Sequence, residues 1–386
     1  MNQQELGAEL RRLRLAANMT LDALAAASGV SVRGIIDLEL GRRMPRRATL
    51  AAIAGGLGVE GAARAALIQV AGGPAAPRAS GAPSRPEHFV GREAELRRIG
   101  RTLADASADA PHPVVISGAS GIGKTALALE GAHALGRLPV FVDATGFDAS
   151  AHSVRTILGQ LVARGDRAPS RVDTVREWRA RTATPAHVSI LDGVGSEELA
   201  RALLAAQSGG VALITSRRPL QGVEGAARIR VGPLDDASSR ALLRTRVGAS
   251  DADDIAELAR VADGFPGALV VVADLIRREG STAAARALLR PERGRLHALT
   301  SDTRSMLVAL QNSDNLLGVR AAALLRMAAG QPGEAVDPVQ LTARVGGSVH
   351  DVTDLLDDLV DHGLLEADDR GYRMLTLVRL FATGLI

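Results

Sequence analysis

A glycine-rich octet around a single lysine constrains the fold of this chain more than any other feature. The octet GASGIGKT runs from Gly118 to Thr125, and Lys124 is the only lysine among 46 Lys and Arg residues. Its spacing, G-x-x-x-x-G-K-[ST], is that of a phosphate-binding P-loop, in which backbone N–H groups face the phosphates and the lysine reaches the β- and γ-phosphates. A compact ammonium on a flexible stem suits that position better than the wide guanidinium of arginine. The octet therefore predicts a nucleotide site.

The segments beside the octet fit the same interpretation. Residues 112–117 (HPVVIS) form a short β-branched run and residues 126–135 (ALALEGAHAL) favour a helix, so the loop joins a strand to a helix. N–H groups of the loop and of the first helical turn then face the phosphates. We expect the nucleotide to contact the following residues: Gly118, Ser120, Gly121, Ile122, Gly123, Lys124, Thr125 and Ala126. Thr125 is the expected Mg²⁺ ligand.

Composition limits what else the chain can be. A length of 386 residues with 46% hydrophobic residues predicts about two to four domains. The absence of cysteine excludes disulfides, cysteine zinc sites and thiol nucleophiles. No signal-peptide pattern opens the sequence, and its longest apolar run, residues 267–276, contains Asp274, so we expect a cytoplasmic protein without a membrane span. Aromatic residues make up only 2%, which argues against base stacking on single-stranded nucleic acid.

The first 70 residues hold nine arginines and six acidic residues, so the formal net charge of +3 lies entirely in this segment. Thr20 is placed to cap a helix over residues 21–27, and Ser31 to cap a second helix over residues 31–40. Between them, Gly29 supplies a left-handed turn residue. This pattern predicts a helix-turn-helix, and over about residues 5–60 it resembles the Cro/Xre-type domains of bacterial regulators.

That resemblance implies double-stranded DNA as a partner. The second helix enters the major groove in such domains, which places near the base edges Ser31, Val32, Arg33 and Asp37. Phosphate contacts are then expected from Arg42, Arg43, Arg46 and Arg47. The chain departs from the usual polar residues at Leu21, Gly34 and Ile36, so base readout is expected to be thin. The alternative is a helical bundle used for protein contact.

A proline- and glycine-rich segment, residues 71–87, predicts a flexible linker after this head. Beyond the P-loop, apolar runs at residues 138–143, 187–191, 211–215 and 227–231 alternate with helical stretches, which predicts a parallel α/β sheet. Asp192 directly follows one of these runs. At this distance from a P-loop it is typical of a Walker B aspartate, which holds Mg²⁺ through water.

From about residue 88 to residue 386 the order of motifs resembles the STAND class of P-loop NTPases, in its NB-ARC branch. Three segments carry the resemblance besides the P-loop and Asp192: residues 89–93 (FVGRE), 215–217 (TSR) and 264–269 (GFPGAL). The resemblance implies that Val90 lies near the adenine and Arg92 near the nucleotide. It also implies that Arg217 contacts the γ-phosphate and that Pro266 packs on the nucleotide.

Two departures from that family bear on mechanism. Relatives commonly carry a second acid after the strand-ending aspartate to activate water, and here that position is Gly193. Residues 372–377 (YRMLTL) resemble the Met-His-Asp motif of the family's winged helix, with Leu375 and Thr376 in place of His and Asp. Leucine cannot donate the hydrogen bond that the histidine makes to ADP. We therefore expect slow hydrolysis, and either a weak resting lock or another residue that supplies it.

The segment before that motif predicts the winged helix itself. Residues 318–328, 338–345 and 351–361 are amphipathic, and residues 368–371 (DDRG) form the turn of a short hairpin. The third helix carries a series of acids: Asp351, Asp354, Asp357, Asp358 and Asp361. Because DNA phosphates repel such a helix, a regulatory lid is favoured over DNA binding.

Together these features predict a multidomain chain. It comprises an all-α helix-turn-helix head (1–70), the linker (71–87), an α/β P-loop NTPase domain (88–232), a helical lid (233–300) and a winged-helix domain (301–386). The hypothesis is a transcriptional regulator switched by ATP or ADP with Mg²⁺, in which Lys124, Asp192 and Arg217 are the catalytic candidates and heads self-associate on DNA. Relatives carry a C-terminal sensor, and this sequence stops soon after the last motif, so we expect a member without a sensor or a truncated one.

Two alternatives stay open. One is a signalling ATPase whose N-terminal bundle recruits proteins, with turnover as its output. The other is a DNA-binding protein that holds ADP permanently as a structural ligand.

The arginines of the predicted head are expected to make two kinds of DNA contact, which mutations can separate. Substituting Arg33 should relax sequence preference by about 1 to 3 kcal/mol, because a base contact is lost. Substituting Arg43 or Arg46 should weaken binding to all sequences alike, because a phosphate contact is lost. Titrations of specific and scrambled duplexes measure both effects, and equal losses on both duplexes for Arg33 would contradict its placement.

Overall fold

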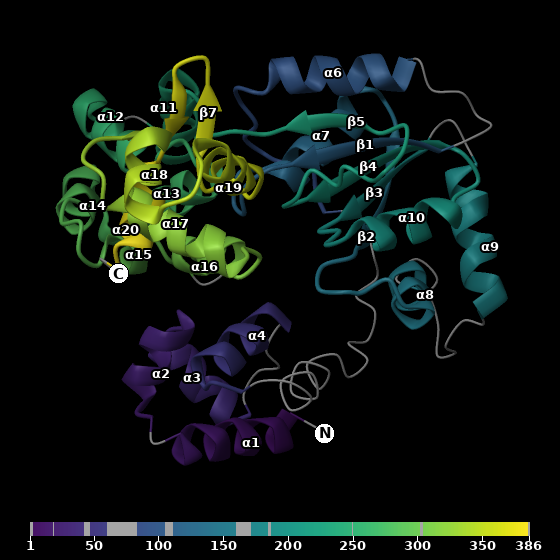
Figure 1. Ribbon diagram of the computed structural model, residues 1–386. Helices are drawn as coiled ribbons and strands as arrows, with labels where there is room; N and C mark the ends of the chain where they lie inside the picture. The colour runs from purple at the N-terminus through teal and green to yellow at the C-terminus, as the bar shows by residue number, and fades with distance from the viewer. Residues whose placement is uncertain are drawn as a thin grey trace. The chain divides into compact units, whose positions relative to one another are not determined.

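The computed structural model describes residues 3–17, 19–41, 47–59, 83–104, 111–159, 171–183, 187–248, 250–301 and 304–384. The chain divides into two compact units, residues 1–78 and 79–386, and each is described by itself. In Figure 1 the first unit is purple, and the second runs from blue through green to yellow.

The first unit is built from short helices with strong local caps. They are α1 (Gln3–Ala16), α2 (Leu21–Ser28), α3 (Val32–Glu39) and α4 (Arg47–Gly56). Thr20 Oγ1 accepts the N–H of Ala23 at 3.0 Å, and Ser31 Oγ accepts the N–H of Gly34 at 3.1 Å. Gly29 takes φ 66° between the two helices. The predicted helix-turn-helix is thus present, with each helix ending within a residue of the expected bounds.

A small core and one ion pair hold this unit together. Its core includes the buried side chains of Leu6, Leu10, Leu24, Ile35, Leu50 and Ile53. Arg14 of α1 forms a bidentate pair with Glu39 of α3, at 2.6 and 2.7 Å, and both side chains are about nine-tenths buried or more. Because a buried charge is costly without its partner, this pair fixes α1 against the end of α3.

The second unit begins with a five-stranded parallel sheet of order β2-β3-β4-β1-β5. Its strands are β1 (Pro111–Ser117), β2 (Leu138–Asp143), β3 (His187–Asp192), β4 (Gly210–Ser216) and β5 (Ala227–Arg230). Apolar runs predicted each of them, because a parallel sheet is buried on both faces. Helices α6 (Glu93–Ala104) and α7 (Lys124–Ala134) share the core on one face. The other face packs against α8 (Ala151–Gly159), α9 (Arg171–Thr182) and α10 (Glu197–Ala205).

The predicted linker is anchored where its last residues reach this domain. Residues 71–82 lie outside the described residues, whereas 83–87 are described. Arg85 makes a bidentate pair with Glu130 of α7, at 2.9 and 2.6 Å. The helix that follows the P-loop is therefore tied to the segment that leads from the head.

The described elements that directly follow the sheet are helices. They are α11 (Asp236–Val247), α12 (Ala252–Val261), α13 (Pro266–Glu279), α14 (Thr282–Leu289), α15 (Arg295–Ala298) and α16 (Met306–Asp314). The longest apolar run of the sequence lies in α13, which is buried along most of its length. Among the described residues, no helix is both long and apolar enough to cross a membrane.

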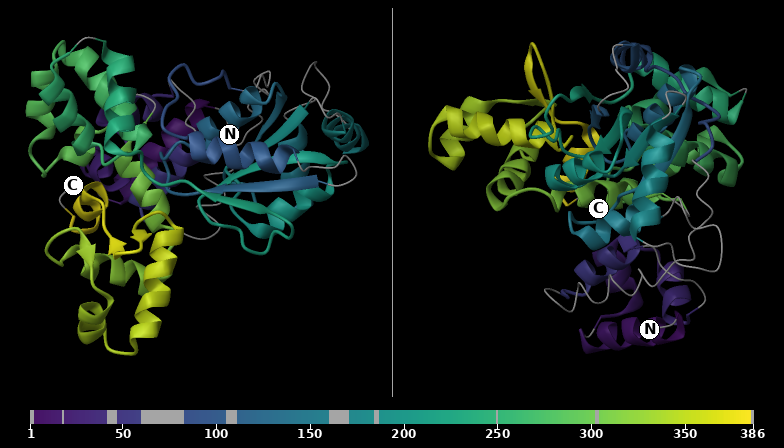
Figure 2. Two further views of the ribbon diagram at one scale, coloured as in Figure 1. Left: turned by 90° about the horizontal axis from the view of Figure 1, so that it is seen from above. Right: turned by 90° about the vertical axis from the view of Figure 1, so that its right-hand side faces the viewer.

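The C-terminal segment combines helices with a small antiparallel sheet of order β6-β8-β7. Its elements are α17 (Val319–Ala329), β6 (Ala335–Val336), α18 (Pro338–Val345), α19 (Val349–Asp361), β7 (Glu366–Asp368), β8 (Gly371–Arg373) and α20 (Thr376–Ala382). Helix α19 starts two residues before the predicted position, because Ser348 and Asp351 form a capping box. Figure 2 shows this yellow segment beside the green helices, at one end of the sheet.

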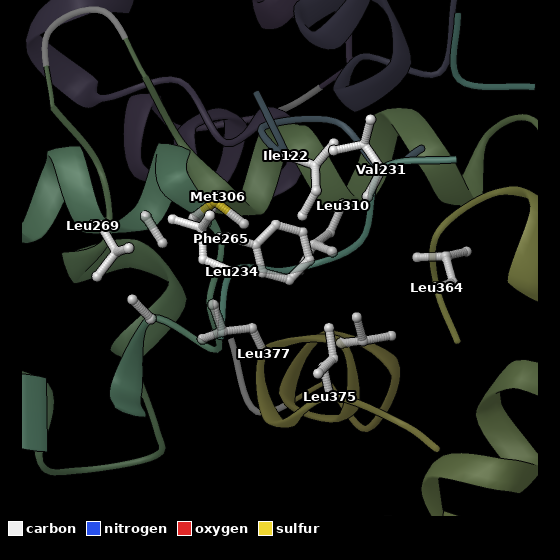
Figure 3. Packing of buried hydrophobic residues seen from close by; sticks show 14 of the residues in the cluster. Ile122, Val231, Leu234, Phe265, Leu269, Met306, Leu310, Leu364, Leu375 and Leu377 are labelled. Carbon is white, nitrogen blue, oxygen red and sulfur yellow. The ribbon is translucent and has the colours of Figure 1, made fainter. Parts of the chain in front are cut away.

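One hydrophobic cluster joins the sheet, the helices and the C-terminal segment. Figure 3 shows Ile122 of the P-loop, Phe265 before α13, Leu310 of α16 and Leu377 of α20 within it. Each of these side chains is at most 2% exposed. The parts of the second unit therefore share a core, which makes the position of each dependent on the others.

Asp263 links two of these parts with a strained backbone. It takes φ 50°, which is unusual for a residue other than glycine, and its carboxylate accepts the N–H of Leu377 in the first turn of α20. A further hydrogen bond comes from the side chain of Thr376. Burial raises the pKa of Asp263 to about 6.

This carboxyl predicts a pH dependence of stability. Because its pKa is above the ordinary value of 3.8, the folded state binds the proton more tightly than the unfolded state does. Between about pH 4 and pH 7 the wild type should lose stability relative to Asp263→Asn, by on the order of 1 to 3 kcal/mol. Urea unfolding of both proteins across that range measures the difference, and a pH-independent difference would contradict the placement of Asp263.

Candidate functional site

The octet forms the loop between β1 and α7, and its glycines are required by its shape. Gly118, Gly121 and Gly123 take φ of 146°, 81° and 96°. A Cβ on Gly118 would lie 2.4 Å from the backbone oxygen of Val231, closer than any real contact. The backbone thus wraps tightly, as a loop that presents N–H groups to an anion does.

Lys124 is the first residue of α7, and its ammonium lies inside the loop. Its Nζ donates to the carbonyl oxygens of Gly118 at 2.9 Å and Ala119 at 2.7 Å. Burial lowers the pKa of Lys124 to about 8, the positive charge of Arg217 acts in the same direction, and Asp192 opposes both. A polyphosphate beside this buried ammonium would stabilise its charged form.

Asp192, at the end of β3, collects two hydroxyl groups on one carboxylate oxygen. Its Oδ1 accepts from Thr125 Oγ1 and from Thr215 Oγ1, each at 2.7 Å. Thr215 Oγ1 in turn accepts the N–H of Gly193 at 2.9 Å. Burial raises the pKa of Asp192, whereas the two threonine hydrogen bonds lower it. The structure thus brings together the two residues expected to serve Mg²⁺, and their oxygen donors are of the type that this hard cation prefers.

Thr215 was missed as a site residue by sequence reasoning. It belongs to the TSR segment that ends β4, where attention went to the arginine. Its hydroxyl orients Asp192, a role that becomes visible only when β3 and β4 are paired.

Arg217 is the arginine of that segment that faces inward. It is half-buried, whereas Arg218 is exposed. The Arg217 Nη1 donates to the backbone oxygen of Asn312 in α16, at 3.1 Å. The guanidinium therefore lies close enough to Lys124 to lower the pKa of that ammonium. It also forms a hydrogen bond to α16, a helix outside the sheet.

Arg92 forms hydrogen bonds to the backbone of the P-loop and of the segment after β5. It is buried, and its Nη2 donates to the backbone oxygen of Gly232 at 2.6 Å and, more weakly, to that of Ile122 at 3.4 Å. Val90, two residues earlier, is half-buried against the large core. The FVGR segment thus contacts the P-loop, with the guanidinium of Arg92 engaged by loop and strand carbonyls.

Helix α13 packs directly on the P-loop. The N–H of Gly267 donates to the backbone oxygen of Gly121 at 2.9 Å. Pro266, the first residue of α13, would lie 3.7 Å from a Cβ on Gly123. The structure therefore places Pro266 beside the glycines of the loop.

The C-terminal segment reaches the same loop at Gly363, a residue that no sequence motif identifies. A Cβ on Gly363, which follows α19, would lie 2.5 Å from the backbone nitrogen of Ala119. Leu375 and Leu377 point into the shared core (Figure 3), and Leu375 is 7% exposed. Leu375 is thus buried in the core, and Gly363 makes the contact with the loop.

Gly193 has no room for a side chain. It takes φ 74°, and a Cβ there would lie 2.1 Å from Thr145 Oγ1. An acid directly after Asp192 would therefore require Thr145 to move.

The candidate DNA-contacting residues are only partly described. Ser31 uses its hydroxyl to cap α3, and Val32 and Asp37 are half-buried on that helix. Arg33 lies on α3 and Arg47 on α4, but their side chains are outside what the structure describes. Outside the described residues altogether are Arg42, Arg43 and Arg46.

Comparison with protein families matches both units. Residues 5–67 match the helix-turn-helix domain family, and residues 88–315 match the AAA ATPase domain family.

Among curated proteins, the chain is 28% identical over 316 residues to the regulatory protein AfsR of Streptomyces griseus, covering 78% of this chain and 32% of AfsR. It is 33% identical over 109 residues to the uncharacterized HTH-type transcriptional regulator Mb0023 of Mycobacterium bovis, covering 28% of this chain and 41% of that protein. The chain thus spans less than half the length of these relatives.

Among solved structures, the Walker-type ATPase paby2304 of Pyrococcus abyssi is similar with a TM-score of 0.51 and 17% identity. The similarity covers 77% of this chain and 97% of that one. At this identity it supports the fold alone.

Removing the amine of Lys124 should abolish most nucleotide affinity. Lys124→Ala loses a charge-assisted contact, so binding of fluorescent ADP should weaken by about 10 to 100-fold. Lys124→Arg should not restore it, because the wide guanidinium does not fit a loop closed by Gly118 and Ala119. Arg97→Ala, at an exposed position of α6, is the matched control. Wild-type affinity in Lys124→Ala would rule out this loop as the site.

Proposed function

The chain belongs to the AAA ATPase domain family and carries a helix-turn-helix domain, and from this premise we propose that it is a DNA-binding transcriptional regulator switched by ATP and ADP. The observation that carries the proposal is the convergence of separate elements on the P-loop backbone. Helix α13 bonds to Gly121, and Gly363 packs on Ala119. A change of the bound nucleotide would therefore shift both α13 and the segment that contains Gly363.

We further propose that the second unit has the STAND arrangement of the NB-ARC branch. In this proposal residues 88–232 bind the nucleotide, residues 233–300 form the helical lid, and residues 301–386 form a winged-helix domain. The order of α17, β6, α18, α19 and the hairpin β7–β8 supports the last assignment. Acids along α19 support a lid role for it, because they repel DNA phosphates.

Arg217 is the proposed sensor of the γ-phosphate. Its hydrogen bond to Asn312 links the end of β4 to α16. A γ-phosphate offers a charged acceptor that is stronger than a backbone carbonyl, so ATP would draw Arg217 away from α16 and ADP would leave the bond in place. The two nucleotides thus favour different positions of the helices beyond the sheet.

Asp263 is the proposed substitute for the histidine lock of related proteins. Its carboxylate, next to the α13 segment that touches the P-loop, holds the first turn of α20. In this proposal, the hydrogen bond between Asp263 and Leu377 holds the lid against the C-terminal segment in the ADP state. Leu375 cannot supply such a lock, because its side chain has no group that can form a hydrogen bond to a nucleotide. Of the alternatives left by the sequence, this favours a lock supplied by another residue.

The proposed partners are double-stranded DNA and further copies of the chain. A single head offers few base contacts, so pairing of heads would add affinity through effective concentration. The position of the lid would then control whether two heads can bind DNA together. The segment that contains Arg85, which pairs with Glu130, would connect each head to its nucleotide-binding domain.

DNA binding in defined nucleotide states tests this proposal. The full chain should bind DNA with affinities that differ by about 5-fold or more between ATPγS, ADP and no nucleotide. Lys124→Ala should show the nucleotide-free affinity throughout, because it cannot hold the ligand. A salt series identifies the phosphate contacts, since affinity falls steeply with salt when phosphates are neutralised.

Other outcomes point to the alternatives. Equal DNA affinity in all nucleotide states would overturn the switch. ADP that survives prolonged dialysis would favour a structural ligand, and fast multiple turnover without DNA binding would favour a signalling ATPase.

A further inference from the structure

We propose that Asp143, at the end of β2, is the carboxylate that orients the attacking water in this site, in place of the acid that is absent at Gly193. The inference rests on the proposed nucleotide site and adds a residue to it. It also changes the expectation for hydrolysis, because the second acid is then relocated instead of lost.

Strand register places Asp143 beside Asp192. Strands β2 and β3 are parallel neighbours (Figure 1), and the register pairs Asp143 with Asp192. Paired residues of adjacent strands point to the same face of a sheet. The pair therefore sets two carboxylates side by side at the ends of these strands.

That face is the one covered by the P-loop helix. Along β3, Val188 and Ile190 belong to the core shared with α7, so Asp192 continues this alternation. Along β2, Phe141 packs against the same core, and Asp143 follows it by two residues. Both carboxylates therefore belong to the face of the sheet that α7 covers.

The turn after β2 fills the space that a second acid on β3 would use. The N–H of Ala144 donates to the backbone oxygen of Asp192 at 2.8 Å, which holds the turn against β3. Thr145 Oγ1 then lies where a side chain on Gly193 would start. The N–H of Thr145 donates to Asp143 Oδ1 at 2.9 Å, which fixes the carboxylate. The same turn therefore excludes an acid from β3 and supplies one from β2.

Asp143 is also accessible, as a residue that binds water must be. It is exposed, whereas Asp192 is half-buried and carries two threonine hydrogen bonds. The two carboxylates are thus suited to different tasks. Asp192 with Thr125 fits the metal, and Asp143 fits a water molecule.

The step that Asp143 would assist is hydrolysis of ATP. Asp143 accepts a hydrogen bond from a water molecule, whose oxygen forms a bond to the γ-phosphorus. The bond from that phosphorus to the bridging oxygen of ADP breaks. One proton of the water stays on the released inorganic phosphate, and the other leaves to solvent by way of the carboxylate.

A merely structural role for Asp143 makes a different prediction. Asparagine keeps an oxygen that accepts the Thr145 N–H, so Asp143→Asn preserves the turn but removes the charge. Asp143→Glu keeps the charge. If the residue only shaped the turn, Asn would be tolerated at least as well as Glu.

Two readouts on the full chain test the assignment. The first is single-turnover hydrolysis of radiolabelled ATP with Mg²⁺ and excess protein. Asp143→Asn should slow it by at least about tenfold, and Asp143→Glu should stay closer to the wild type.

The second is binding of fluorescent ADP with and without aluminium fluoride. The wild type should bind more tightly with fluoride, and Asp143→Asn should lose most of that gain while keeping its affinity for ADP alone. Glu224→Gln, an exposed acid in the turn before β5, is the matched control.

The possible failures are distinguishable. Equal single-turnover rates in wild type and Asp143→Asn, whether measurable or not, would overturn the role of Asp143 and leave the switch in place. A rate restored by Asn but not by Glu would do the same. Absence of nucleotide binding in the wild type would overturn both this inference and the proposed function.

Discussion

The structure depends on close packing against the backbone of the P-loop. Helix α13 bonds to Gly121, and Gly363 lies against Ala119 so closely that no side chain could be added. Packed interfaces of this kind do not deform continuously but change between discrete arrangements. The loop therefore serves as the common support of the helices and of the C-terminal segment, in addition to its role as the candidate phosphate site.

The charged residues around the P-loop are the groups that a bound nucleotide would affect most. Lys124 and Arg217 bring two positive charges to the site, and burial lowers the pKa of Lys124 to about 8. Buried charges without full compensation are costly. In the proposed function, a polyphosphate would add negative charge here and would compete for Arg217, which in the structure is bonded to Asn312. In this proposal, the same charges affect both the affinity for nucleotide and the position of α16.

Sequence alone predicted the parts of this molecule that depend on local pattern. The P-loop, the strands and Asp192 follow from glycine spacing and from apolar runs that a parallel sheet buries on both faces. Residues 374–376 identified a departure from a motif, but not the residue that we propose as its replacement, because Asp263 reaches Leu377 across a sequence separation of 114 residues. Gly363 and Thr215 were missed for the same reason: each acts through a neighbour in space. The position of Arg92 behind the loop likewise depends on its contact with Gly232.

The most direct test of coupling between loop and lids is amide hydrogen exchange on the full chain, with ADP and with ATPγS. ATPγS and ADP should give different exchange at Gly267 and Leu377, beyond the P-loop itself, because these amides bond to Gly121 and Asp263. Exchange that changes only within residues 118–126, and is the same at both reporter amides with either nucleotide, would contradict it.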